Sequence, residues 1–264
     1  MKIWQIELTN RCNFSCVYCP RTELMKREIG VMSEDTMRQI AKICTSDKIR
    51  LHHYGESLLY PELCETAIKI FSEHNIKTGI NTNGSAATVK NVKRVFDAGL
   101  DELIISWHPL DKRVNKNEST SVRYLQELIE HLPKPYLDRM ELIRVVDPQE
   151  YDDAKKEMKQ YSAIKCSIKR KRNLGQVFGI GSSKQTSCSF LNNTEFAVLW
   201  DGTIATCCEV YENKPDWTHG NVFGVLPKTN TGCSLCVGCE GYGNSEQETE
   251  RTQIKKSTAD ELFE

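Results

Sequence analysis

The sequence predicts an α/β protein with a parallel sheet, followed by a smaller β-rich part. Along residues 1–175, β-branched apolar runs alternate with segments whose apolar residues recur at helical spacing, which is the order expected of consecutive strand–helix units. From about residue 176 this alternation stops, and the runs TEFAVLW and TIATCC are joined by Asp201-Gly202, a dipeptide suited to a tight hairpin. At 264 residues, the chain is long enough for one large α/β domain or a barrel with a small appendage.

The predicted elements follow one another closely. IWQIELT, residues 3–9, is the first expected strand. A helix is expected over 32–44, because Ser33 is a suitable N-cap and acidic residues follow it in the first turn. Further strands are expected at 48–54, 76–82, 102–107, 139–146 and 164–170, and further helices at about 61–74, 87–98, 120–132 and 149–161. This order predicts six βα-type units, with a hairpin over 194–208 and a polar tail over 246–264.

Composition excludes several partners. The net charge is −1, from 35 basic and 36 acidic residues, which gives no electrostatic reason to expect nucleic acid or an anionic membrane. No apolar run approaches the roughly 18 to 20 residues that cross a bilayer. The start MKIWQIELTNRC lacks the basic and apolar regions of a secretory signal. We therefore expect a cytoplasmic protein, and a monomer.

The twelve cysteines need a separate explanation, because the cytosol keeps thiols reduced and a disulfide framework is out of place there. Cys44, Cys64 and Cys166 lie in helix- or strand-patterned segments and are predicted to be small buried hydrophobes. The other nine form an N-terminal and a C-terminal group: Cys12, Cys16 and Cys19, then Cys188, Cys207, Cys208, Cys233, Cys236 and Cys239.

The N-terminal group, CNFSCVYC, has the spacing C-x3-C-x2-C. Three such thiolates can hold three corners of a cubane iron–sulfur cluster and leave the fourth iron without a protein ligand. A structural zinc site normally takes four protein ligands. The nearest histidines, His52 and His53, are more than thirty positions away. Zinc therefore stays an alternative, and an open iron–sulfur cluster is preferred.

CNFSCVYC, with the aromatic Tyr18 before its last cysteine and a run of βα units around it, resembles the signature of the radical S-adenosylmethionine (radical SAM) superfamily. The resemblance implies a partial (β/α)6 TIM-like barrel over residues 1–175 and a 4Fe-4S cluster on Cys12, Cys16 and Cys19. It also implies that the open iron chelates SAM, and that one electron from a reductant such as flavodoxin or ferredoxin releases a 5′-deoxyadenosyl radical. That radical takes a hydrogen atom from the substrate.

Other segments resemble the family's cofactor-binding motifs. HHYGESLLYPEL matches the glycine-glutamate motif that holds the SAM amino group, so Gly55 and Glu56 carry over, although Tyr54 and Ser57 replace the usual glycine and proline. In NTNGS, Asn83 is expected to make a polar contact to the cofactor. Alternatively, Glu56 only caps a helix and Asn83-Gly84 is only a turn.

Three further candidates stand where the fourth and fifth strands are expected to end. Ser106, His108 and Arg144 are predicted around the SAM ribose, its carboxylate or the substrate, because the chemistry of α/β barrels gathers at the C-terminal ends of the strands. The alternative for His108 is a hydrogen bond to backbone at a strand end.

The C-terminal group, C-x13-G-x4-C with a later C-x2-C, resembles the SPASM/twitch extension of radical SAM enzymes. Its six cysteines are too few for the eight ligands of two auxiliary clusters. The resemblance thus implies a twitch domain over 176–245 with one auxiliary 4Fe-4S cluster, whose expected ligands are Cys188, Cys207, Cys236 and Cys239. Cys208 and Cys233 can replace a neighbouring ligand or donate a hydrogen atom, and a zinc ribbon-like site is the alternative.

Within the family, HHYGE, CCE and KRKRNLGQ resemble segments of 2-deoxy-scyllo-inosamine dehydrogenase and other small twitch enzymes. This resemblance implies that Glu209 and Arg172 hold a small polar substrate, with Cys208 beside them. Arg170 or Lys171 can align in place of Arg172, and a solvated basic strand end is the alternative. The expected reaction is dehydrogenation of a sugar or aminocyclitol alcohol, with the auxiliary cluster accepting the electron. A radical SAM epimerase, a peptide-modifying enzyme, and a non-catalytic iron–sulfur electron carrier are the alternatives.

Overall fold

The computed structural model describes residues 1–16, 19–107, 122–146, 148–170, 188–236 and 239. Tyr18, His108 and Arg172, together with the expected tail over 246–264, lie outside the described residues. In the part that is described, no helix is both long and apolar enough to span a bilayer.

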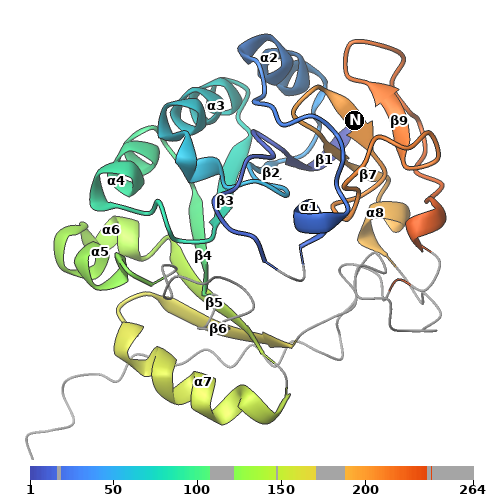
Figure 1. Ribbon diagram of the computed structural model, residues 1–264. Helices are drawn as coiled ribbons and strands as arrows, with labels where there is room; N and C mark the ends of the chain where they lie inside the picture. The colour runs from blue at the N-terminus through green and yellow to red at the C-terminus, as the bar shows by residue number, and fades with distance from the viewer. Residues whose placement is uncertain (17–18, 108–121, 147, 171–187, 237–238, 240–264) are drawn as a thin grey trace, which may run out of the picture.

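Within the described residues, nine strands form one sheet in the order β6-β5-β4-β3-β2-β1-β7-β8-β9. The first six run parallel to their neighbours, as the sequence predicted: β1 (Lys2–Ile6), β2 (Lys48–Arg50), β3 (Lys77–Thr82), β4 (Glu102–Trp107), β5 (Met140–Val146) and β6 (Lys165–Arg170). The sheet is curved and open, since β6 and β9 are its two edges (Figure 1). The predicted α/β class is confirmed, and the unclosed sheet agrees with a partial barrel.

The C-terminal strands extend the same sheet. β7 (Glu195–Val198) pairs with β1 in parallel, while β8 (Thr203–Ala205) and β9 (Thr218–Asn221) add antiparallel pairs. The predicted hairpin is confirmed between β7 and β8. At its turn Gly202 has φ +84°, a conformation that favours glycine. The region around the second cysteine group is thereby fixed next to the strand that precedes the first.

The helices line the outer side of the curve (Figure 1). They are α2 (Glu34–Ile43), α3 (Pro61–Glu73), α4 (Val89–Asp97), α5 (Leu125–His131), α6 (Lys134–Leu137) and α7 (Tyr151–Met158). Ser33 caps α2, since its side chain accepts a hydrogen bond from the Thr36 amide at 3.1 Å. Two short helices, α1 (Pro20–Glu23) and α8 (Ser189–Asn192), follow cysteines of the two groups, and 3-10 turns occupy Ser57–Leu59, Pro148–Glu150, Lys159–Tyr161 and Ser234–Cys236.

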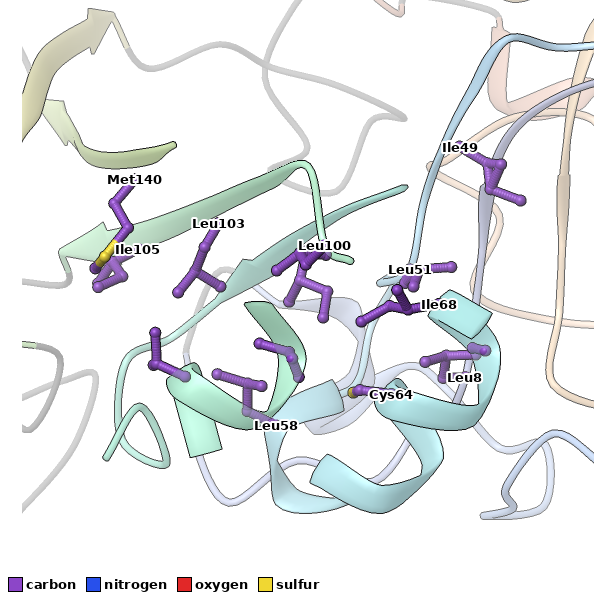
Figure 2. Close-up of a cluster of buried hydrophobic side chains, with 14 of the residues drawn as sticks. Leu8, Ile49, Leu51, Leu58, Cys64, Ile68, Leu100, Leu103, Ile105 and Met140 are labelled. Carbon is purple, nitrogen blue, oxygen red and sulfur yellow. The ribbon is translucent and has the colours of Figure 1, made fainter. Parts of the chain in front are cut away.

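Between the sheet and these helices lies the main hydrophobic core. Figure 2 shows part of it, with side chains from strands and helices packed together: Leu8, Ile49, Leu51, Leu58, Cys64, Ile68, Leu100, Leu103, Ile105 and Met140. Cys64 and Cys166 are buried in this core and Cys44 packs against it, as predicted for small hydrophobes. Burial raises the pKa of Cys166 to about 11, so this thiol stays protonated at neutral pH.

The inner face of the sheet carries charged side chains as well as the apolar Ile104 and Ile143. Strand side chains alternate between faces, so the neighbours of core residues such as Leu103 and Ile105 point inward. There Glu102 pairs with Lys48 and Arg50, each at 2.7 Å, and Glu141 pairs with Lys165 at 2.8 Å. These ion pairs connect β2 to β4 and β5 to β6 near the N-terminal ends of the strands, and the opposite ends are left for the candidate site.

Candidate active site and metal centres

The N-terminal cysteine loop follows β1 and closes on itself. Phe14 and Cys16 are buried together, and Cys12 and Cys19 pack against them as partly buried thiols. The Cys19 amide donates to the Cys16 carbonyl at 3.0 Å, and the Thr22 hydroxyl donates to the same carbonyl at 2.9 Å. The loop therefore holds the three predicted cluster ligands around one small apolar centre.

Gly55 supports this loop by close backbone approach. A Cβ atom at this position would lie 2.0 Å from the Thr9 carbonyl oxygen and 3.0 Å from that of Arg11, both of them backbone atoms. The next amide, that of Glu56, donates to the Arg11 carbonyl at 2.8 Å. Only glycine fits here, because the loop after β2 lies directly on the backbone leading to Cys12.

Glu56 is buried and makes three hydrogen bonds with neutral partners. Its Oε1 accepts from the Leu58 amide at 3.0 Å and from the Thr82 hydroxyl at 2.8 Å, while Oε2 accepts from the Asn83 amide at 2.7 Å. Burial raises the pKa of this carboxyl despite these hydrogen bonds. Glu56 does cap the short 3-10 helix, as the alternative proposed, and it also fixes the loop after β3.

Asn83 links the loop after β3 to the first cysteine. Its Nδ2 lies 3.7 Å from Cys12 Sγ and donates to Asn13 Oδ1 at 3.1 Å, while its own Oδ1 accepts from the Ser85 amide at 2.9 Å. Gly84 has φ +80°, so the expected turn is present as well. An amide N–H directed at a ligand sulfur is a contact that tunes iron–sulfur clusters.

The second cysteine group lies next to a separate small core that includes Val210, Trp217 and Leu235. Cys207 and Cys233 pack against this core. Burial, with the nearby Glu209, Cys236 and Cys188, raises the pKa of Cys207 well above its usual value. The Cys233 amide lies 3.3 Å from Cys236 Sγ, and the Cys239 amide donates to the Cys236 carbonyl at 3.3 Å. The structure thus brings the four expected auxiliary ligands into one region.

Glu209 and Tyr54 lie at the junction of the two cysteine groups. Burial raises the pKa of Tyr54 far above its usual value, and the charges of Glu209, Cys208, Cys19 and Cys207 act in the same direction. Burial also raises the pKa of Glu209, against the influence of Cys208, His53 and Tyr54. Cys208 Sγ is 3.4 Å from Glu209 Oε1. Glu209 therefore lies next to Cys208 of the second group and is near enough to Cys19 of the first for its charge to raise the pKa of that thiol.

Arg144 makes its contacts with α7 and Trp107. It forms an ion pair with Glu157 of α7, and its guanidinium lies 4.8 Å from the centroid of the Trp107 ring, which packs on the outer core. Ser106, on the neighbouring strand β4, is half-buried and stands opposite Ile143 in the register. The contacts of Arg144 are those of a residue that fastens α7 to the sheet.

A buried charge network was missed from the sequence. Glu7 is completely buried, accepts two hydrogen bonds from the guanidinium of Arg27 at 2.6 and 2.5 Å, and lies 3.0 Å from His53 Nδ1. Burial opposes its charge, but the hydrogen bonds from His53 and Arg27 lower its pKa to about 2. The sequence offered one signal for this network, since Glu7 is a charged residue within the apolar segment IWQIELT that was predicted to be a strand.

The donor sets fit iron–sulfur chemistry. Three partly or fully buried thiols surround Phe14, and the Asn83 amide approaches one of the sulfurs. Among the residues with described positions, no three Cys, His, Asp or Glu side chains are gathered tightly enough to hold a single metal ion. A cubane spreads its thiolate ligands over several irons, so it does not need them as close together as one zinc ion does.

Comparison with known proteins places the chain in a family. The family described as the radical SAM superfamily matches residues 6–160. A curated relative from Niallia circulans, named S-adenosyl-L-methionine-dependent 2-deoxy-scyllo-inosamine dehydrogenase, is 27% identical over 110 residues, which are 39% of this chain and 44% of the relative. A probable GTP 3′,8-cyclase of Methanothermobacter marburgensis is 33% identical over 109 residues, which are 40% of this chain and 35% of the relative. The chain spans less than half of the length of these two relatives.

A solved structure resembles most of this chain. The crystal structure titled BtrN in complex with AdoMet and 2-DOIA superposes with a TM-score of 0.59 and 19% identity, covering 84% of this chain and 78% of that one. At this identity the likeness shows the fold. The superfamily match covers more than half of the sequence and includes the cysteine loop, Gly55, Glu56 and Asn83. This protein therefore belongs to the radical SAM superfamily, as the resemblance of its CNFSCVYC segment implied.

Proposed function

We propose that the protein is a radical SAM oxidoreductase that acts on a small polar substrate, and that its reaction is dehydrogenation of a sugar or aminocyclitol alcohol. The observation that carries this proposal is the position of Glu209, a half-buried carboxyl 3.4 Å from Cys208 Sγ whose charge raises the pKa of Cys19 in the first group as well as that of Cys207 and Cys208 in the second. A carboxylate there can bind a hydroxyl or an amine close to both groups of thiols. The dehydrogenase from Niallia circulans supports the choice of substrate class.

Cys12, Cys16 and Cys19 would hold the 4Fe-4S cluster that the family implies, and Gly55, Glu56 and Asn83 would shape the SAM site. When bound, cluster and SAM supply a 5′-deoxyadenosyl radical that takes a hydrogen atom from the substrate. The Glu56 carboxylate is hydrogen-bonded only to neutral groups among its described partners, so a cationic amine is a suitable further partner for it.

In this proposal Cys188, Cys207, Cys236 and Cys239 hold an auxiliary 4Fe-4S cluster in a twitch domain over 176–245. The effect of Cys188 and Cys236 on the pKa of Cys207 supports it, because these three thiols must then lie near one another. The protein's own part in the reaction is to orient the alcohol and to exclude water and other hydrogen donors. Flavodoxin or ferredoxin as reductant, a monomeric state and a cytoplasmic location stay predictions.

Anaerobic reconstitution tests the family chemistry in this chain. With dithionite and SAM the wild type is expected to form 5′-deoxyadenosine, and Cys16→Ala is expected to form none because one iron loses its ligand. Cys44→Ala is the matched control, since Cys44 packs against the core away from both groups. An electron carrier without radical chemistry would form no 5′-deoxyadenosine even as the wild type.

Iron analysis and product analysis test the finer claims. Two cubanes correspond to about eight irons per chain, and Cys207→Ala should retain about four. With an aminocyclitol deuterated at the reacting carbon, deuterium should appear in 5′-deoxyadenosine and a ketone should form. An epimerised product carrying a solvent-derived hydrogen, or turnover of peptides only, would contradict the dehydrogenase proposal.

A further inference from the structure

Arg21 holds a positive charge against the first cysteine loop. It is the second residue of α1, which begins directly after Cys19. Its guanidinium folds back and donates a hydrogen bond to the backbone carbonyl of Phe14. Phe14 is the aromatic residue with which Cys12, Cys16 and Cys19 pack. The charge of Arg21 is therefore fastened to the centre of the loop that carries the three expected cluster ligands.

The next residue of α1 makes two further contacts with the same loop. The Thr22 amide donates to the Cys19 carbonyl at 3.0 Å, and the Thr22 hydroxyl donates to the Cys16 carbonyl at 2.9 Å. Arg21 and Thr22 together thus place three donors on three carbonyls of the loop. This anchoring fixes the guanidinium relative to the sulfurs, so its charge needs no reorganisation before it acts on them.

The charge of Arg21 is permanent and only partly screened. A guanidinium keeps its proton at every pH at which an ordinary protein is folded. The Arg21 side chain is half-buried, so it faces a medium less polarisable than bulk water. A lysine in its place would keep the charge but not the planar fork that reaches the Phe14 carbonyl.

Such a charge favours the more negative of two redox states. A cubane on three thiolates is already anionic when oxidised, and the electron from the reductant adds a further negative charge. Net charge and hydrogen bonds to the sulfurs are among the factors that set the reduction potential of a cluster. The Phe14 amide lies 3.4 Å and the Asn83 side-chain nitrogen 3.7 Å from Cys12 Sγ. These N–H groups act in the same direction on one sulfur, and Arg21 adds a full charge.

We propose that Arg21 is a positioning residue that places a positive charge beside the first cysteine group, raises the reduction potential of the cluster held there, and so eases transfer of the electron that starts the reaction. The inference rests on the proposed function, because it needs a 4Fe-4S cluster on Cys12, Cys16 and Cys19. A residue that only braced the loop would leave the reduction potential unchanged once the cluster is assembled.

The variants separate charge from hydrogen bonding. Arg21→Lys keeps the charge. Arg21→Gln is neutral but keeps an N–H donor, and Arg21→Met is neutral without a donor. Thr22→Val is the matched control, because it removes the hydroxyl donor to the Cys16 carbonyl from the same helix without changing any charge.

The measurement is a redox titration of the reconstituted holoenzyme without SAM, followed by electron paramagnetic resonance. The signal of the first cluster is the one that is missing in Cys16→Ala. Arg21→Gln and Arg21→Met are each expected to lower the equilibrium constant for one-electron reduction about tenfold, the effect of a unit charge about 10 Å away. This is a fall of about 59 mV in the potential. Arg21→Lys and Thr22→Val should titrate close to the wild type, and the iron content should be the same in all four variants.

Three results would overturn the inference and leave the proposed function standing, provided that the wild type still forms 5′-deoxyadenosine. The first is an unchanged potential in both neutral variants. The second is a shift in Arg21→Lys or Thr22→Val as large as that in Arg21→Gln, because loop geometry would then set the potential. The third is loss of iron from both neutral variants, which would assign Arg21 to cluster assembly.

The opposite separation is also measurable. If the neutral variants shift the potential as expected but the wild type forms no ketone from the aminocyclitol, the inference about Arg21 stands and the dehydrogenase proposal falls. A wild-type chain that holds no cluster on its first cysteine group would overturn both.

Discussion

Replacing Arg27 with methionine is expected to destabilise the protein by about 2 to 3 kcal/mol at pH 7, since breaking a buried ion pair leaves an uncompensated charge. The Arg27 side chain is 5% exposed and Glu7 is completely buried, so solvent screens the pair very little. The pKa of Glu7 falls from its usual value near 4.5 to about 2 in the folded protein. This difference corresponds to about 3.4 kcal/mol, which Arg27 and His53 share as the two stabilising partners.

The pH dependence follows with a definite sign. Because folding lowers the pKa of Glu7, its contribution is fully present above about pH 4.5 and is lost as the pH falls toward 2. Between pH 7 and pH 3.5 the wild type should lose about 1.4 kcal/mol through this group. Arg27→Met should lose less over the same range, because the pKa of Glu7 in the folded variant lies nearer to its unfolded value.

Urea unfolding of the cluster-free chains, followed by tryptophan fluorescence, measures both effects. Arg38→Met is the matched control, because Arg38 pairs with Glu34 and Glu73 on the surface and solvent screens these contacts. A loss for Arg27→Met no larger than that for Arg38→Met, or an unchanged difference between the two pH values, would refute the reasoning from burial.

Two further predictions concern the loop after β2. Gly55→Ala should abolish iron incorporation at the N-terminal cysteines, because the added Cβ would lie 2.0 Å from the Thr9 carbonyl oxygen. Gly224→Ala is the control: its added Cβ would have its nearest neighbour at 3.4 Å, so this variant should incorporate iron normally in the same assay. Burial and the nearby Arg50 lower the pKa of His52 to about 3, so its imidazole should stay neutral by NMR down to about pH 4. Because the unfolded chain binds that proton more readily, His52 should lower stability as the pH falls from about 6.5 toward 3.

Local patterns in the sequence predicted most of the sheet. Each of the first six strands is a short apolar run followed by turn residues, and the caps are local signals, as Ser33 at the start of α2 illustrates. The predicted strand 48–54 is shorter, ending at Arg50, because Ser57 donates to the Leu51 carbonyl at 2.6 Å and turns the chain away. The pairing of β7 with β1 was not predictable from local patterns, since these strands are nearly two hundred residues apart.

The candidate site shows the same limit. The cysteine motif, Gly55 and Glu56 are contiguous signals, whereas Glu7, Arg27 and His53 come from three segments that meet only in the fold. Arg144 was chosen because it stands near a strand end. Strand alternation places it on the same face as Leu142 and Val146, which lie in the outer core, and this pattern could have indicated its pairing with α7.

Glu212 connects the segment behind the first cysteine group to the region of the second, and this connection can be tested. Its carboxylate accepts from the Lys26 amide at 2.9 Å and the Arg27 amide at 2.8 Å. Glu212→Ala removes a charged acceptor worth about 1.5 to 3 kcal/mol, so exchange of these two amides should speed up by about ten- to a hundredfold. Asn213→Ala, whose side chain bonds to Asp201 instead, is the control. If exchange at Lys26 and Arg27 stays at the wild-type rate, the two groups of thiols are held in place by the β1–β7 pairing and the Glu7–Arg27 pair without help from Glu212.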